Sequence, residues 1–253
     1  MRTKIVMIVF GVGLALAAAG QTQAPSKKTS TPPPQPKETF WERVLRISGV
    51  SANPNTLKGA DDEPVSGQIW MADLPSGATR RLTEEFGYRS PIFYSNGTDI
   101  LALQGADVVR ISSGGGRGVK LFHIAGITKF VGFSIDDPDQ ALMLKEDEAG
   151  RASVSLLSVK TGAVALLPYD PQSSRDRQML EDLQGWQRTY GGTTVYLKRE
   201  SRDTLSGTVE ISNVFAKSAG RDPINISRCD MTNCGQPSLS PDGNHVLFIK
   251  GEL

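Results

Sequence analysis

A two-strand unit that recurs four times is the feature that most constrains the fold of this chain. Each unit consists of a short apolar strand, a glycine-containing turn and a second strand. The units cover residues 67–83, 107–124, 152–168 and 207–227. A second kind of hairpin follows each unit, at residues 90–103, 128–144, 184–197 and 237–249. Self-similarity at a spacing of roughly 40–55 residues indicates a repeat architecture, in which neighbouring units bury one another's apolar faces. We therefore expect an all-β repeat protein.

The turns between these strands have the chemistry of tight hairpins. Asn96-Gly97 and Asp242-Gly243 are dipeptides that tolerate positive φ angles. With 26 glycines and 15 prolines, the chain favours many turns over long helices. Because only 38% of the residues are apolar, a core has to be assembled from many short segments.

The predicted strands are apolar on both faces. In the first unit, alternation places Ile69 and Met71 on one face of the strand. Trp70, Ala72 and Leu74 lie on the other face. Strands of this kind fit the inner positions of a sheet that is covered on both sides. Three further apolar runs fit the same positions, at residues 100–103, 141–144 and 246–249.

Two segments carry a family resemblance. Residues 67–77 read Gly-Gln-Ile-Trp-Met-Ala-Asp-Leu-Pro-Ser-Gly and lead through Arg-Arg-Leu-Thr to Tyr-Arg-Ser-Pro. Residues 237–248 read Pro-Ser-Leu-Ser-Pro-Asp-Gly-Asn-His-Val-Leu-Phe. Both resemble the repeats of TolB-like β-propellers, a WD-repeat-like family of six-bladed type. The resemblance extends over residues 67–251 and implies a propeller fold; it specifies a function poorly, because propellers serve many unrelated roles.

The number of repeats bears on how a propeller ring would close. Counted from the Ser-Pro strand, three blades are complete, at residues 91–124, 130–167 and 184–227. The last two strands, in residues 237–251, lack two partners, which residues 68–83 can supply. Closure by both ends of the chain removes the open sheet edges that invite aggregation. We expect a propeller of four blades, or an incomplete ring that is a piece of a longer propeller.

The N-terminal residues have the composition of an export signal. Arg2 and Lys4 precede an apolar stretch at residues 5–19, which ends in three alanines. The stretch is shorter than the roughly 20 residues of a membrane span, so we expect a signal peptide over residues 1–20. An uncleaved anchor is the alternative. After cleavage we expect no stable membrane span, and a periplasmic or secreted protein in an oxidising compartment.

Two segments connect this signal to the repeats. Residues 21–39 are rich in proline and polar side chains, and we expect a disordered linker. Residues 40–66 form a connecting segment, and the propeller covers residues 67–253. Within the connecting segment, residues 44–49 resemble 246–251 and compete for the same strand position. A short helix that begins at the capping-box pattern of residues 39–42 is the alternative.

Cys229 and Cys234 are the only cysteines. In an oxidising compartment they predict a local disulfide that closes a loop between two strands and contributes about 2 kcal/mol. A redox site would more typically show Cys-x-x-Cys, and a zinc site needs two further ligands.

Other candidate sites have ordinary structural interpretations. His123 and His245 fall in different repeats, and no Gly-x-Ser-x-Gly motif exists, which disfavours a catalytic triad. The acidic runs at 61–63 and 136–139 could bind calcium, but we expect solvated loops, because neither has the spacing of a calcium loop. The glycines of residues 114–118 lack the lysine of a phosphate-binding loop and predict a hairpin tip. We expect no catalytic residue, metal ligand or cofactor.

The sequence therefore favours a non-enzymatic binding or scaffold module with a protein partner whose identity is open. The net charge of +1 gives no reason to expect nucleic acid. Two alternatives remain: a propeller that binds a small ligand or metal, and an accessory or truncated part of a propeller-containing hydrolase.

Overall fold

A computed structural model describes residues 66–251, except residues 95, 134–136, 169, 171, 179–187, 191, 206 and 231. The predicted signal peptide, the linker and all but the last residue of the connecting segment lie outside the described residues.

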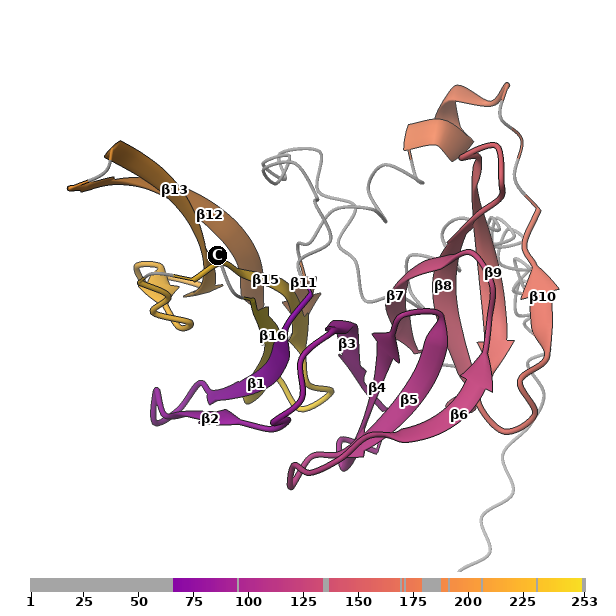
Figure 1. The fold of residues 1–253 in the computed structure, drawn as a ribbon, viewed down its shortest axis with the longest axis horizontal. Helices are drawn as coiled ribbons and strands as arrows, with labels where there is room; N and C mark the ends of the chain where they lie inside the picture. The colour runs from indigo at the N-terminus through magenta and orange to yellow at the C-terminus, as the bar shows by residue number, and fades with distance from the viewer. Residues whose placement is uncertain are drawn as a thin grey trace, which may run out of the picture. The chain divides into compact units, whose positions relative to one another are not determined.

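The described strands form four antiparallel sheets of four strands (Figure 1). One contains β3 (Tyr88–Phe93), β4 (Asp99–Gln104), β5 (Asp107–Ser112) and β6 (Val119–His123). The next contains β7 (Ile127–Phe133), β8 (Gln140–Glu146), β9 (Ala152–Ser158) and β10 (Val164–Leu166). A third contains β11 (Arg188–Tyr190), β12 (Thr193–Thr204), β13 (Gly207–Ser218) and β14 (Ile224–Asn225). The fourth, which we name the closing sheet, contains β15 (Cys234–Leu239), β16 (His245–Lys250), β1 (Gln68–Asp73) and β2 (Thr79–Arg81).

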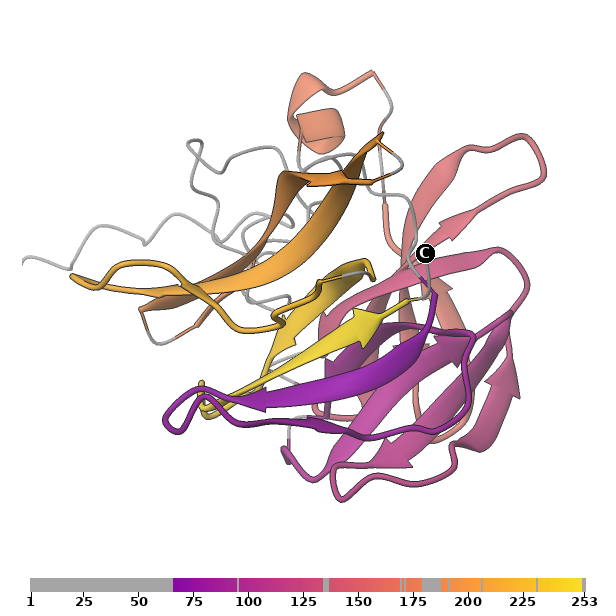
Figure 2. The same cartoon turned by 60° about the vertical axis from the view of Figure 1, so that its left-hand side comes forward.

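The closing sheet joins strands from both ends of the described chain. β1 runs antiparallel to β16, with Ile69 opposite Ile249 and Ala72 opposite Val246. Figure 2 shows the violet β1 alongside the yellow β16. The predicted completion of residues 237–251 by residues 68–83 is thus confirmed. The all-β propeller class is confirmed as well, since three sheets are consecutive four-stranded meanders and the fourth is shared between the ends.

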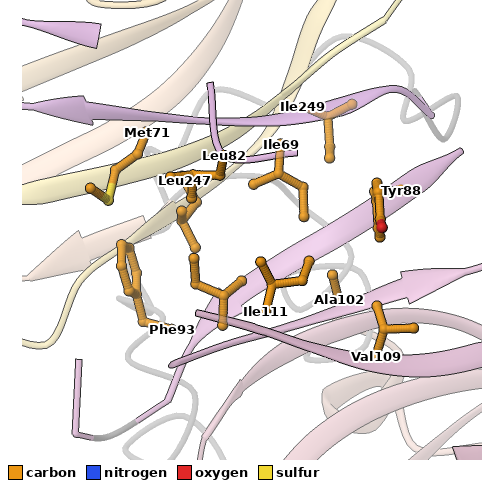
Figure 3. Close-up of a cluster of buried hydrophobic side chains, with 11 residues drawn as sticks. Ile69, Met71, Leu82, Tyr88, Phe93, Ala102, Val109, Ile111, Leu247 and Ile249 are labelled. Atoms are coloured by element: carbon orange, nitrogen blue, oxygen red, sulfur yellow. The ribbon is translucent and has the colours of Figure 1, made fainter. Parts of the chain in front are cut away.

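Alternation along β1 sends its side chains into two different cores, as predicted. Ile69 and Met71 pack with residues of the β3–β6 sheet (Figure 3). Ala72 belongs to a second cluster, with Val195, Val214 and other residues of the β11–β14 sheet. β1 is therefore covered on both faces, and the closing sheet packs between two others.

A third cluster joins the β3–β6 sheet to the β7–β10 sheet, with Leu101 and Leu103 packed among Phe130, Ala141 and Met143. The predicted apolar runs 100–103, 141–144 and 246–249 are buried at every position. Apolar contacts therefore link the sheets in the order β7–β10, β3–β6, closing sheet, β11–β14.

Side-chain hydrogen bonds connect the first strands of three sheets. The Ser90 backbone N–H donates to Gln236 Oε1, and Ser90 Oγ accepts from the Phe130 N–H at 2.6 Å. Ser90 and Gln236 have φ angles of 52° and 54°, each precedes a proline, and each lies where the strand register shifts. Non-glycine residues in this conformation cost roughly 1–3 kcal/mol and persist only where the surroundings fix them.

Arg89 adds a second connection between sheets. Its guanidinium donates to the carbonyls of Gly105, Ile127 and Thr128. Burial lowers the pKa of this guanidinium. The three carbonyl acceptors offset the cost of burying the charge and fix β3 against the start of β7.

The β12–β13 hairpin differs from its prediction. The sequence pattern ends the first strand near residue 197, whereas β12 continues to Thr204 and pairs with β13 throughout (Figure 1). β11 pairs only with residues 193–195 and β14 only with 215–216, so the far part is a two-stranded ribbon. Its side chains are mostly polar and charged, with Arg199 lying 3.7 Å from Glu210 across the strands. An apolar pattern cannot reveal a ribbon of this kind.

The spacing of apolar residues in 173–184 predicts a short helix, and residues 174–178 are helical. Ser173 Oγ accepts from the Asp176 N–H at 3.2 Å, as an N-cap does. Met179, Leu180 and Leu183, which define the predicted apolar face, lie outside the described residues. In the described part of the chain, no helix has the length and apolar composition of a membrane span.

The closing pair gives a first prediction. Ile249 is fully buried opposite Ile69, so Ile249→Ala should lower the free energy of unfolding by about 2–5 kcal/mol. Val119→Ala, at a side chain that is 57% exposed, should change it by no more than about 0.5 kcal/mol. Urea denaturation of both variants measures the difference. Equal unfolding midpoints would show that the closing sheet does not unfold with the rest.

The Asp242 turn gives a second prediction, on pH. Hydrogen bonds from Ser240 Oγ and the Asn244 N–H lower the pKa of Asp242 from 3.8 to about 2. Because the pKa is lower in the folded state, the stabilisation is complete above about pH 4 and is lost as the pH falls toward 2.

The stability difference between the native protein and Asp242→Asn should therefore shrink between pH 5 and pH 2. It should stay under about 1 kcal/mol, because solvent screens an exposed carboxylate. Denaturation at several pH values measures it, with Glu148→Gln, at an exposed loop position, as control. A difference that is constant over this range would contradict the assignment.

Candidate functional site

Cys229 and Cys234 form the predicted disulfide, with Cα atoms 6.2 Å apart. Both residues are buried in the cluster between the closing sheet and the β11–β14 sheet. The location is more specific than the sequence indicates, because Cys234 is the first residue of β15 rather than part of a loop. The bond therefore ties the segment after β14 to the first strand of the neighbouring sheet.

Asn213 holds the same segment by hydrogen bonds. This fully buried side chain lies on β13, and its Oδ1 accepts from the Cys229 N–H at 2.7 Å and from Ser227 Oγ at 3.0 Å. Its Nδ2 donates to the Cys229 carbonyl at 3.3 Å. Sequence reasoning missed this residue; the available signal is an asparagine directly before the apolar run of residues 214–216.

A groove of about 320 Å³ lies beside this segment, and we name it the arginine groove. It separates the β1–β2 turn from the β13–β14 hairpin and the residues that follow. Its buried lining is apolar and comes from Ala72, Ala216 and Ile226. Its exposed lining is mostly polar or charged and includes Ser76, Arg221, Asp222 and Arg228, together with Ile224, which is 58% exposed.

The charges of the arginine groove are unbalanced. Arg221 and Arg228 contribute two guanidinium groups, and Asp222 contributes one carboxylate. Among the described residues, neither guanidinium has an ion pair or a side-chain hydrogen bond. The groove therefore presents two cationic groups whose hydrogen-bond donors are available to a ligand.

Local hydrogen bonds fix one wall of the arginine groove. Arg228 has a φ angle of 48°, and its backbone N–H donates to Asn225 Oδ1 at 2.9 Å. The disulfide at the next residue, Cys229, anchors the same backbone. Backbone strain of this kind is concentrated at binding and catalytic sites.

The opposite wall is fixed in a similar way. Asp73 Oδ1 accepts from the Ser76 N–H at 2.8 Å and from the Ser76 hydroxyl. These bonds lower the pKa of Asp73 and hold the β1–β2 turn. Hydrogen bonds within the protein therefore hold both walls of the groove.

A second depression, of about 400 Å³, adjoins the glycine-rich tip between β5 and β6. The Gly115 N–H donates to the Ser112 carbonyl, and the Gly116 N–H to the Leu82 carbonyl, both at 2.8 Å. Arg117 lies 3.4 Å from Glu85 in an ion pair. These amides are occupied, which supports the predicted hairpin tip over a phosphate cradle.

The remaining candidate residues lie apart from one another. His123 pairs with Asp107 at 2.7 Å in the β3–β6 sheet, while His245 lies 3.4 Å from Asp73 in the closing sheet. Of the predicted acidic runs, Asp139 pairs with Lys160 at 2.6 Å. Residues 61–63 and Asp136 lie outside the described residues. Within the described part, no three His, Cys, Asp or Glu side chains gather as a metal site.

No protein-family model matches the chain, and no curated protein matches it either. Among solved structures, the chain is similar to a protein described as TolB from Agrobacterium tumefaciens, at 14% identity and a TM-score of 0.36, over 72% of this chain. For tricorn protease the identity is 10% and the TM-score is 0.43, over 65% of this chain. For the AtxE2 isopeptidase the identity is 15% and the TM-score is 0.29, over 68% of this chain. The chain spans 60%, 24% and 34% of these three proteins, and similarity at this level assigns no activity or partner.

The Asn213 contacts give a third prediction. Asn213→Ala leaves the Cys229 N–H and carbonyl without their partners, so the free energy of unfolding should fall by about 1–3 kcal/mol. Asn244→Ala, at an exposed turn position, is the matched control and should cost no more than about 0.5 kcal/mol. Denaturant titration under non-reducing conditions compares them. If the two variants cost the same, Asn213 does not hold the disulfide segment.

Proposed function

We propose that this chain is an exported, non-enzymatic propeller that binds a partner protein through the arginine groove. One observation carries the proposal: two guanidinium groups, without an ion pair among the described residues, border a groove whose walls are held by a disulfide and by local hydrogen bonds. A groove whose backbone is already ordered loses less conformational freedom on binding, which favours a recognition surface.

Export is supported by two independent features. The N-terminal pattern of residues 1–20 is that of a signal peptide. The Cys229–Cys234 disulfide persists in oxidising compartments and is rare in the cytosol. Together they favour a periplasmic or secreted protein, and the TolB-like motifs of residues 67–91 and 237–248 fit such a location.

Four carboxylates of the described residues have lowered pKa values with structural causes. Asp73, Asp147 and Asp242 have lowered pKa values because turn hydrogen bonds stabilise their carboxylates. Asp107 has a lowered pKa because it pairs with Lys120 and His123 on the surface. Catalytic carboxylates more often have perturbed pKa values through burial in a cleft, so these four residues read as structural.

A site-specific photo-crosslinker tests the proposal. Introduced at Ile224, which lines the arginine groove, it should give a discrete adduct with another protein when the full chain is expressed in its native host. The matched position is Leu166, which is 71% exposed on β10 and outside the groove. It should give no such adduct. Absence of an adduct at Ile224, or the same adduct at both positions, would refute protein binding at the groove.

A further inference from the structure

We infer that the arginine groove recognises an acidic, extended peptide segment, in which an apolar side chain lies between two carboxylates. The inference rests on the proposed function and adds the chemistry of the partner.

The positive charge of the groove favours an anionic ligand. Arg221 and Arg228 are exposed, and their guanidinium groups have no ion pair within the part of the chain that the structure describes. A guanidinium presents a planar fork of donors that matches a carboxylate in two parallel hydrogen bonds. The carboxylate of Asp222 repels an anionic ligand. With two arginines and one aspartate, the lining has a net charge of one positive unit. The groove should therefore favour acidic segments, and Asp222 should limit their affinity.

The apolar lining of the groove favours an apolar ligand side chain between the two carboxylates. Ala72, Ala216 and Ile226 form a buried apolar surface, and Ile224 adds an exposed apolar side chain. Small side chains at two of these positions leave space for a larger one from the ligand. Burial of an aliphatic side chain there adds affinity, at about 25 cal/mol per Å² of apolar surface.

The volume of the groove favours a linear segment over the surface of a folded domain. About 320 Å³ is at the lower limit of ligand pockets and accommodates a few side chains rather than the surface of a folded domain. A linear segment satisfies this limit, because consecutive side chains can reach both arginines and the apolar lining in turn.

Blocked peptides labelled with a fluorophore test the inference, with binding followed by fluorescence anisotropy. The probe is Gly-Glu-Leu-Glu-Gly, and the matched peptide is Gly-Gln-Leu-Gln-Gly. The native protein should bind the first peptide more tightly, and the difference should diminish between 50 and 500 mM salt, as expected for partly exposed charges.

Substitutions then locate the site. Arg221→Gln and Arg228→Gln should each weaken binding of the acidic probe by about two- to five-fold, the range of exposed ion pairs. Asp222→Asn should strengthen it by a similar factor. Arg110→Gln, at an exposed arginine of β5, is the matched control and should have no effect. All four positions are exposed, and thermal melts should show unchanged stability.

Each outcome decides the inference. Equal binding of the two peptides, or no binding of either at millimolar concentration, overturns it. An equal effect of Arg110→Gln also overturns it, because attraction would then be non-specific. If a crosslinked adduct still forms at Ile224, protein binding at the groove stands and only the acidic chemistry of the partner is wrong.

Discussion

The pairing of β1 with β16 is the interaction on which the rest of the structure depends. β1 is hydrogen-bonded between β16 and β2, and its two faces enter two separate hydrophobic clusters. Burial of fully enclosed aliphatic side chains contributes roughly 1.5–3 kcal/mol each. If β1 separates, both neighbouring sheets lose part of their cores and β16 becomes an open edge. β1 therefore joins strands from both ends of the described chain into one sheet, which packs against both neighbouring sheets.

The same pairing determines whether the arginine groove exists. One wall of the groove follows directly from β1, whereas the other wall belongs to the β13–β14 hairpin, about 140 residues later in the chain. The Cys229–Cys234 disulfide and Asn213 act at this junction and not at a distant one. Apolar packing brings the two walls together, and the directional bonds then fix their details. A groove made in this way is absent from either wall alone.

Sequence reasoning predicted the parts of the fold that depend on local periodicity. Turn dipeptides and apolar alternation located the hairpins, the two-faced burial of β1 and the completion of the last sheet by residues 68–83. The cysteine pair was also accessible, because only one pairing is possible. Polar contacts between sheets cannot be predicted in this way. Ser90 bonds to a residue 146 positions away, and nothing in the adjacent sequence indicates that partner. The β12–β13 ribbon was missed for the opposite reason: its strands are regular but lack the apolar pattern.

Apolar and polar contacts have different effects on the arrangement of the sheets. This difference explains why buried polar residues occur in a core that apolar side chains could fill. Apolar burial is non-directional, so it favours contact between sheets without specifying their relative positions. The bonds among Ser90, Gln236 and Phe130 require defined distances, and a displacement of one sheet would leave buried groups without partners. That cost restricts three sheets to one arrangement. Asn213 imposes the same restriction beside the disulfide, where its bonds to Cys229 and Ser227 hold the segment that carries Arg228.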